Sequence, residues 1–423
     1  MKRHIFLISF VLVAIACSVC IKESNAAGCC AASAKSVKNC SIENLIVKVA
    51  DRQLRELKDV QYIRDEQGRL KKYVPPEGVE WQYAWGVTLY GLLRTSETLG
   101  EEKYRDFVVR HNENAARHYD HLRGKLRYSE KYVSDPGMKY LMRLTMLDDC
   151  GSMGSQILEG ILRGNAQVTP EVSEAVAVIG DYIFRKQSRL PDGSFWRPGK
   201  EAAVWNDDLY MSVPFLVRYA EYSGRQEYLD DAARQIINFA GYTQDKDGLF
   251  FHAYFPDQRK TSPYKWCRAN GWTILSIVEF LSANGQNHKD GDKILSIYKK
   301  HAEGLKRCQA DSGLWRQVLD HPELWEETSS TAMFVYAIAR GVNRGWLDKS
   351  YLQVALKGYE GLKKNITDEG AILNVCQGTG IGQTLEYYID RDKPFDDAHG
   401  PGPVLLALTE LKIACEKQQI TLQ

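Results

Sequence analysis

The sequence predicts an all-α fold, an (α/α)6 barrel of six helical hairpins, on three observations. Apolar residues recur at helical spacing along most of the chain, as in Trp81, Trp85 and Leu89, whereas the alternation typical of strands is sparse. Candidate helices end at glycines about 60 residues apart, and glycine commonly follows a helix end. Helices that are apolar nearly all round alternate with more polar ones, as inner and outer rings require.

The first 26 residues have the pattern of a secretory signal peptide. A basic head precedes a charge-free run over residues 5–21, and Ser24-Asn25-Ala26 places small residues before a cleavage site after Ala26. The run is short for a spanning helix. We therefore expect an exported protein, periplasmic or extracellular, without a membrane-spanning segment in the mature chain. A lipid-anchored form processed before Cys17 is the alternative.

Residues 27–40 are predicted to form an N-terminal tail and residues 41–423 the barrel domain. Its apolar helices begin near residues 79, 148, 205, 268, 327 and 401, and its polar helices near 41, 101, 170, 226, 290 and 346. The helix near 41 is expected to close the ring against the last hairpin, although an open superhelix of the same hairpins is the alternative. The glycines predicted to end helices are Gly100, Gly164, Gly224, Gly285 and Gly341.

Charge and cysteine content exclude some classes of protein. The 55 Lys+Arg against 54 Asp+Glu give a net charge of +1, which argues against a nucleic-acid partner. Paired-cysteine and His-Glu metal motifs are missing from the sequence after the tail, so we expect neither a metal nor a cofactor. Export permits disulfides, and Cys29, Cys30 and Cys40 could pair in the tail. Free, buried thiols are expected for Cys150, Cys267, Cys308, Cys376 and Cys415.

Polar and aromatic residues gather where the apolar helices begin. Because inner helices of such a barrel run parallel, their starts meet at one rim. Carboxylates, an arginine and aromatic rings on a concave rim are typical of a sugar site. The rim candidates are Tyr83, Asp148, Asp149, Trp205, Asp207, Asp208, Arg268, Trp272, Glu327 and His399, with Trp196, Arg197 and His252 on the entering turns.

These residues also allow structural interpretations. An acidic residue at a helix start commonly caps the helix, which applies to Asp148, Asp149, Asp208 and Glu327. A buried Arg268 needs an anionic partner, either a substrate carboxylate or a rim aspartate. His252 could be a hydrogen-bonded histidine without a role in chemistry.

Four motifs, taken together and in order, resemble glycoside hydrolase family 105. They are Trp205-x-Asp207-x-Leu209-Tyr210-Met211, Arg268-x-Asn270-Gly271-Trp272, Glu327-Thr328-Ser329-x-Thr331 and His399-Gly400-x-Gly402. Members of that family are unsaturated rhamnogalacturonyl hydrolases, which act in rhamnogalacturonan (pectin) breakdown, and the unsaturated glucuronyl hydrolases of family 88 are related. The resemblance runs from about residue 43 to 416 and implies the same (α/α)6 barrel.

The resemblance implies a particular reaction. The substrate is an oligosaccharide left by a lyase, with a 4,5-unsaturated galacturonyl or glucuronyl residue at its non-reducing end. An acid protonates C4 of the enol ether and water adds at C5, in place of displacement at C1. Asp207 is the implied proton donor, and Asp149 is the preferred second carboxylate, with Asp148 the alternative one residue away. The implied sugar-binding residues are Tyr83, Trp205, His252, Arg268 and Trp272.

The chain departs from the family pattern at Cys267, Ala269 and Trp196-Arg197, which bears on the preferred sugar more than on the reaction. Two other hypotheses stay open. One is a different (α/α)6 enzyme, such as a uronate polysaccharide lyase or an inverting glucanase. The other is a carbohydrate-binding protein without activity.

Overall fold

The computed structural model describes residues 41–126, 137–199, 202–283 and 285–420. The predicted signal peptide and tail lie outside these residues and stay predictions, as do the domain boundaries. Among the helices that the structure describes, none has the length and apolar character needed to span a bilayer.

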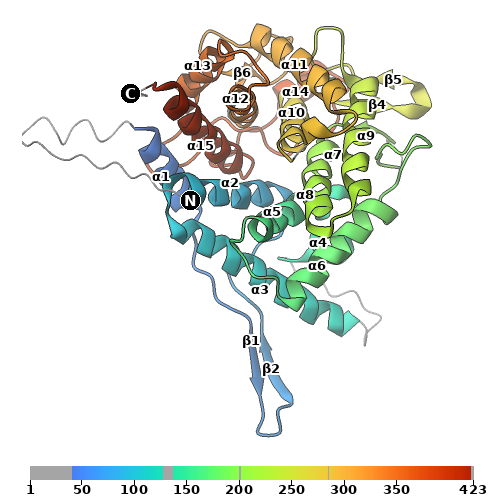
Figure 1. Ribbon diagram of the computed structural model, residues 1–423, viewed down its shortest axis with the longest axis vertical. Coiled ribbons are helices and arrows are strands. Elements are labelled where there is room, and N and C mark those ends of the chain that lie inside the picture. The colour runs from blue at the N-terminus through green and yellow to red at the C-terminus, as the bar shows by residue number, and fades with distance from the viewer. Residues whose placement is uncertain (1–40, 127–136, 200–201, 284, 421–423) are drawn as a thin grey trace, which may run out of the picture. The chain divides into compact units, whose positions relative to one another are not determined.

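Within the described residues, six inner helices form a closed ring (Figure 1). Nearly every residue of the fourth and fifth inner helices is buried, as expected for helices enclosed by others. The last inner helix packs on both the fifth and the first. This contact confirms the predicted barrel and excludes the open superhelix. The inner helices are α2 (Tyr83–Leu99), α5 (Gly151–Leu162), α7 with α8 (Asp207–Tyr210 and Val213–Ser223), α10 (Cys267–Ser282), α12 (Thr328–Asn343) and α15 (Pro401–Gln418).

Six outer helices within the described ranges each pack against an inner one. They bury one face, as α11 does with Ile294, Tyr298 and Leu305. The first of them contacts both α15 and α2, so it covers the junction where the ring closes. The outer helices are α1 (Ile42–Gln53), α3 (Glu102–Leu126), α6 (Pro170–Asp181), α9 (Gln226–Thr243), α11 (Gly291–Cys308) and α13 (Tyr351–Lys363).

Three glycine-containing turns, at Gly248, Gly313 and Gly370, pack against outer helices. Gly370 has a φ of 79°, which favours glycine, and a Cβ there would collide with the carbonyl oxygen of Lys48 in α1. Gly248 and Gly313 meet α11 and α13 in the same way. Each of these turns therefore fixes the next outer helix, and the last one fixes α1.

The prediction that a glycine ends a helix is wrong at two of the five positions, Gly285 and Gly341. Gly100, Gly164 and Gly224 do follow helices with φ near 70°. Gly341 instead lies inside α12. Glycine is needed at this position because a Cβ would collide with the Tyr298 hydroxyl. Gly285 begins a short 3-10 turn, Gly285–Asn287, after α10 has already ended at Ser282.

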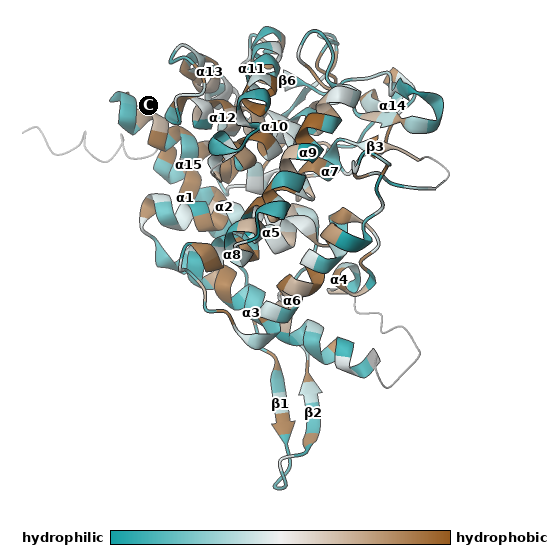
Figure 2. Ribbon diagram, turned by 45° about the vertical axis from the view of Figure 1, so that its right-hand side comes forward, coloured by the Kyte–Doolittle hydropathy of each residue, from teal (hydrophilic) through white to brown (hydrophobic). Residues whose placement is uncertain are grey.

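Short strands also form in segments where strand-like alternation was not evident in the sequence. The antiparallel hairpin β1–β2 (Gln61–Arg64 and Leu70–Val74) projects beyond the helices in two views (Figure 1 and Figure 2). Near the inner-helix starts, β3 (Val204–Trp205), β4 (Ala253–Phe255) and β5 (Lys260–Thr261) form one antiparallel sheet. A second sheet pairs β6 (Trp315–Arg316) with β7 (Glu326–Glu327). Short helices α4 (Lys139–Arg143) and α14 (Leu385–Ile389) lie in connecting segments.

A buried network of charges links the inner helices further along their length. Arg218 of α8 contacts Glu159 of α5 at 2.6 Å and Glu279 of α10 at 2.5 Å. Tyr90 of α2 and Tyr336 of α12 both donate hydrogen bonds to Glu279. Although burial opposes it, the charges of Arg218 and Arg163 hold the pKa of Glu159 at about 2. The network therefore joins five inner helices through ion pairs and tyrosine hydroxyls.

The five cysteines expected to be free are free thiols, and all but Cys308 are buried.

Gly151 sets the spacing between two inner helices at the rim. A Cβ on Gly151 would collide with the carbonyl oxygen of Met211, four residues after Asp207. We expect Gly151→Ala to push α5 from α7, to lower the free energy of unfolding by about 1–3 kcal/mol and to reduce kcat at least about tenfold. Urea unfolding and steady-state kinetics measure both effects.

The matched control is Gly241→Ala in α9, where an added Cβ meets nothing within 4 Å. We expect it to leave kcat unchanged and stability unchanged or slightly higher. Equal effects of the two substitutions would refute the spacing role.

Candidate active site

The short β3–β4 pairing brings Trp205, Asp207 and His252 together. Trp205 lies opposite Ala253 in the sheet, next to His252. The Trp205 indole N–H donates to His252 Nε2 at 2.9 Å, and His252 Nδ1 lies 2.9 Å from the Tyr388 hydroxyl. An indole nitrogen can only donate, so Nε2 is the unprotonated nitrogen and Nδ1–H donates to Tyr388.

Asp207 stands at the start of α7, 3.3 Å from His252 Nε2 through Oδ2. Among the described residues this buried oxygen has no hydrogen-bond partner. The one lone pair of His252 Nε2 already accepts from the Trp205 indole N–H, so His252 forms no hydrogen bond with this oxygen. The Asp207 carboxyl is therefore held beside His252 with an oxygen that is not committed to a protein donor.

The guanidinium of Arg197 binds two further carboxylates at the rim. Arg197 Nη2 lies 2.6 Å from Asp208 and 3.0 Å from Asp148, and the Arg197 guanidinium stacks over the Trp205 ring at 4.2 Å. Burial, with the negative charges of Asp208 and Asp207, raises the pKa of Asp148 to about 6, against the opposing charge of Arg197. Burial also raises the pKa of Asp208. Asp148 therefore retains its proton at mildly acidic pH.

Asp149 occupies a different position from Asp148. Its fully buried carboxylate accepts hydrogen bonds from Arg143 Nη2 at 2.6 Å, from the Thr145 backbone N–H at 2.8 Å and from the Met146 backbone N–H at 3.2 Å. These donors all come from the segment directly before it, residues 143–146. The structure thus brings Asp148, rather than the preferred Asp149, into contact with Arg197, which also binds Asp208.

Arg268 is anchored by neighbouring protein groups. Its guanidinium donates to the Cys376 carbonyl at 2.5 Å and the Gln377 carbonyl at 2.6 Å, and lies 3.7 Å from Glu327 Oε1. Glu327 is the anionic partner that the buried arginine required. It also caps α12 through the Ser330 backbone N–H, as its structural interpretation predicted.

Tyr83 and Trp272 form the aromatic part of the rim. Tyr83 is the first residue of α2, and its ring meets Trp272 edge-on, with centroids 6.3 Å apart. Trp272 also packs on Tyr210 at 5.0 Å and is buried. The charges of Arg268, Asp148 and Asp207 all act on the Tyr83 hydroxyl, which ties this part of the rim to the carboxylates.

Sequence reasoning gave no role to Tyr388 or Asp397. Tyr388 belongs to α14, in the long segment between α13 and α15, and no motif marked it. Asp397 lies two residues before His399, and the Asp-Asp-Ala-His run was its only signal. Arg197 was noted on an entering turn and as a departure from the family pattern, but without a role.

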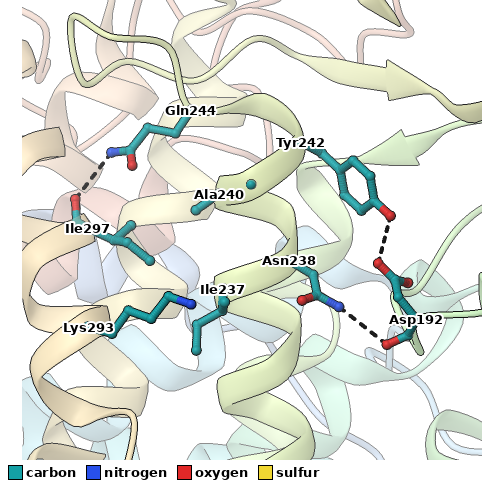
Figure 3. A pocket seen from close by; sticks show the side chains of 9 residues that line it. Asp192, Ile237, Asn238, Ala240, Tyr242, Gln244, Lys293 and Ile297 are labelled. Atoms are coloured by element: carbon teal, nitrogen blue, oxygen red, sulfur yellow. Dashed lines mark hydrogen bonds between the residues drawn. The ribbon is translucent and has the colours of Figure 1, made fainter. Parts of the chain in front are cut away.

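Other features of the molecule lie apart from this rim. A groove of about 550 Å³ runs between the outer helices α9 and α11, where Asn238, Tyr242 and Lys293 line it (Figure 3). It contains none of the rim residues. In the described part of the chain, no three His, Cys, Asp or Glu side chains are placed to hold a metal ion.

A closed (α/α)6 barrel whose rim carries clustered carboxylates, arginines and aromatic rings is typical of carbohydrate-active enzymes. The family model for Glycosyl Hydrolase Family 88 matches residues 45–414. The chain belongs to this family and is a glycoside hydrolase, which confirms the predicted resemblance to families 105 and 88.

Solved structures support the fold. A possible member of family GH105 from Salmonella enterica serovar Paratyphi A has a TM-score of 0.69 and 23% identity, covering 88% of this chain and 94% of that one. A family 105 glycoside hydrolase from C. acetobutylicum has a TM-score of 0.68 and 24% identity, covering 79% and 94%.

Two named relatives are similar in sequence over part of the chain. An unsaturated 3S-rhamnoglycuronyl hydrolase of Alteromonas sp. is 31% identical over 216 residues, which are 49% of this chain and 51% of that protein. The match thus spans about half the length of this relative. The unsaturated rhamnogalacturonyl hydrolase YesR of Bacillus subtilis is 28% identical over 246 residues, which are 56% of this chain and 69% of YesR.

Proposed function

We propose that the protein removes a 4,5-unsaturated galacturonyl or glucuronyl residue from the non-reducing end of lyase-generated oligosaccharides. The observation that carries the proposal is the buried Asp207 oxygen, which lies 3.3 Å from His252 Nε2 and has no hydrogen-bond partner among the described residues. A carboxyl oxygen that is not committed to a protein donor can exchange a proton with a substrate atom. The names of the two relatives, both unsaturated glycuronyl hydrolases, agree with this substrate class.

In the proposed reaction Asp207 transfers its proton to C4 of the enol ether, and positive charge develops at C5 and the ring oxygen. A water molecule adds at C5 and gives its proton to the Asp207 carboxylate, which restores the acid. The C5 hemiketal opens to a ketone, and the hemiacetal left at C1 expels the remaining sugar as an alcohol. One water is consumed, and Asp207 acts first as acid and then as base.

The neighbouring residues have separate tasks in this proposal. His252, held by Trp205 and Tyr388, keeps the carboxyl of Asp207 oriented. Asp148, rather than Asp149, is the second carboxylate. Asp148 shares Arg197 with Asp208, whereas the Asp149 carboxylate is bound by Arg143. The half-buried Tyr83 supplies the sugar-facing aromatic ring, the buried Trp272 supports it edge-on, and Arg268 adds positive charge for the uronate.

A substrate panel tests the proposal. The protein is incubated with unsaturated disaccharides that end in galacturonyl-rhamnose or glucuronyl-amino sugar, and with the intact polymers. We expect ultraviolet absorbance of the conjugated acid to fall as the aglycone is released. A rise in absorbance on intact polymer would identify a lyase instead, and binding without any change in absorbance would identify a binding protein.

Asp148 gives a pH-dependent test on stability. Its pKa in the folded protein, about 6, exceeds the ordinary value of 3.8, so the wild-type fold loses stability as pH rises from about 4 to 6. Asp148→Asn removes this titration while its side-chain oxygen can still accept from Arg197. We expect the variant to gain about 2 kcal/mol at pH 7, with little difference at pH 4, although it loses activity.

Denaturant unfolding at both pH values measures this effect. Asp149→Asn is the matched control and is expected to lose stability at pH 7, because it weakens the contact with Arg143. If Asp148→Asn were less stable than the wild type at pH 7, the elevated pKa of Asp148 would be contradicted.

A further inference from the structure

Three residues from two ends of the barrel domain form a hydrogen-bonded chain at the rim. Asp397 Oδ1 lies 2.5 Å from His399 Nδ1, and it also accepts from the His399 backbone N–H at 3.0 Å. His399 Nε2 lies 2.6 Å from the Tyr83 hydroxyl, 316 residues away in the sequence. The chain Asp397–His399–Tyr83 therefore ends at the aromatic side of the site.

The direction of each hydrogen bond follows from the chemistry of its ends. A carboxylate only accepts, so His399 Nδ1 carries the proton that faces Asp397. Burial and the charge of Arg268 hold the pKa of His399 below its ordinary value, so the imidazole is neutral at ordinary pH and Nε2 has a lone pair. The Tyr83 hydroxyl must then donate to Nε2. Burial raises the pKa of Tyr83, which keeps that proton on its oxygen.

The Tyr83 oxygen also has lone pairs that the hydrogen bond to His399 does not use. Because its one proton is committed to His399, the oxygen can offer only lone pairs to a third group. Tyr83 is only half-buried, lies edge-on to Trp272 and feels the charges of Asp148, Asp207 and Arg268. A ligand hydroxyl that reaches the Tyr83 oxygen meets an acceptor that has no proton to donate.

We propose that Tyr83, oriented by His399 and Asp397, accepts a hydrogen bond from one ring hydroxyl of the unsaturated uronyl residue and so selects for that free hydroxyl. A uronyl residue without this hydroxyl, or with a sulfate or acetyl ester on it, leaves the Tyr83 oxygen unpaired and is a poor substrate. His399 and Asp397 act as positioning residues. The inference rests on the proposed function and adds a specificity that neither the fold nor the family assigns to this chain.

The test compares kcat/KM on an unsaturated uronyl disaccharide and on its 2-deoxy and 3-deoxy forms. We expect the wild type to lose about 10- to 100-fold on one of the two deoxy substrates. Tyr83→Phe is expected to be slower on the parent substrate but to show no further loss on that deoxy form. His399→Phe frees the Tyr83 proton and is expected to reduce the discrimination to less than threefold.

Asp397 supplies a matched pair of variants. Asp397→Asn keeps an oxygen that accepts from Nδ1–H and should preserve the discrimination, whereas Asp397→Leu should lose it. A purely structural role for these residues would lower activity on all three substrates alike and leave the ratio unchanged.

The outcomes separate the two proposals. If the wild type does not hydrate the parent disaccharide, the proposed function fails. If it does, but neither deoxy form is discriminated, or Tyr83→Phe discriminates as the wild type does, the role of Tyr83 is overturned.

Discussion

Replacing Asp207 with asparagine is expected to lower kcat on an unsaturated disaccharide by about 10²–10⁴-fold, with an unchanged far-ultraviolet spectrum. An amide cannot deliver a proton to C4 or take one from the attacking water. Its size matches the carboxyl, so packing at the start of α7 is preserved. Because Asp207 Oδ2 has no hydrogen-bond partner among the described residues, the substitution breaks no hydrogen bond at that atom. Steady-state kinetics with a binding measurement separate lost turnover from lost affinity.

Asp149→Asn is the matched control for chemistry. Its carboxylate is occupied by Arg143, Thr145 and Met146, so we expect lower stability with kcat kept within about tenfold. If Asp149→Asn abolished turnover in a folded protein while Asp207→Asn left it intact, the assignment of the acid would be wrong.

Replacing Arg218 with methionine is expected to lower the free energy of unfolding by about 3–5 kcal/mol. Arg218 and its partners Glu159 and Glu279 are each at most 5% exposed, so the substitution leaves the buried Glu279 without its ion-pair partner and Glu159 with Arg163 alone. The loss affects contacts of α5, α8 and α10 at once. Urea unfolding monitored by circular dichroism gives the free energy directly.

Arg307→Met provides the comparison at the surface. Arg307 and its partner Glu303 are about half exposed, and we expect a change below about 0.5 kcal/mol. The triple variant Glu159→Gln, Arg218→Met, Glu279→Gln is expected to recover part of the lost stability, because no unpaired buried charge remains. A loss below about 1 kcal/mol for Arg218→Met alone would show that the network is replaceable.

The barrel could be predicted because its signals are local. The 3.6-residue spacing of apolar side chains marks helices such as α10 and α12, and nearly all-round burial separates them from one-faced helices such as α11. Helix ends depend on more than composition. Gly341 was misassigned because it is required by the approach of Tyr298, a contact between helices that the sequence does not display.

The sequence indicated which residues gather at the rim better than it indicated the contacts between them. Asp207, His252, Trp205, Tyr83 and Trp272 lie on or near the inner-helix starts, as the parallel helices require. Asp148 and Asp149 are consecutive residues of the 3-10 turn Leu147–Asp149, and the spacing of apolar residues cannot tell which of the two faces Arg197. Tyr388 reaches His252 across 136 residues, from a segment without a motif.

The most direct test of the central claim follows the substrate double bond by proton nuclear magnetic resonance while the aglycone is released. We predict that the vinylic C4 proton signal disappears in step with aglycone release in the wild type, and that both persist with Asp207→Asn. Release of an aglycone from a uronyl residue that keeps its vinylic signal would show ordinary displacement at C1 and would contradict enol-ether hydration by Asp207.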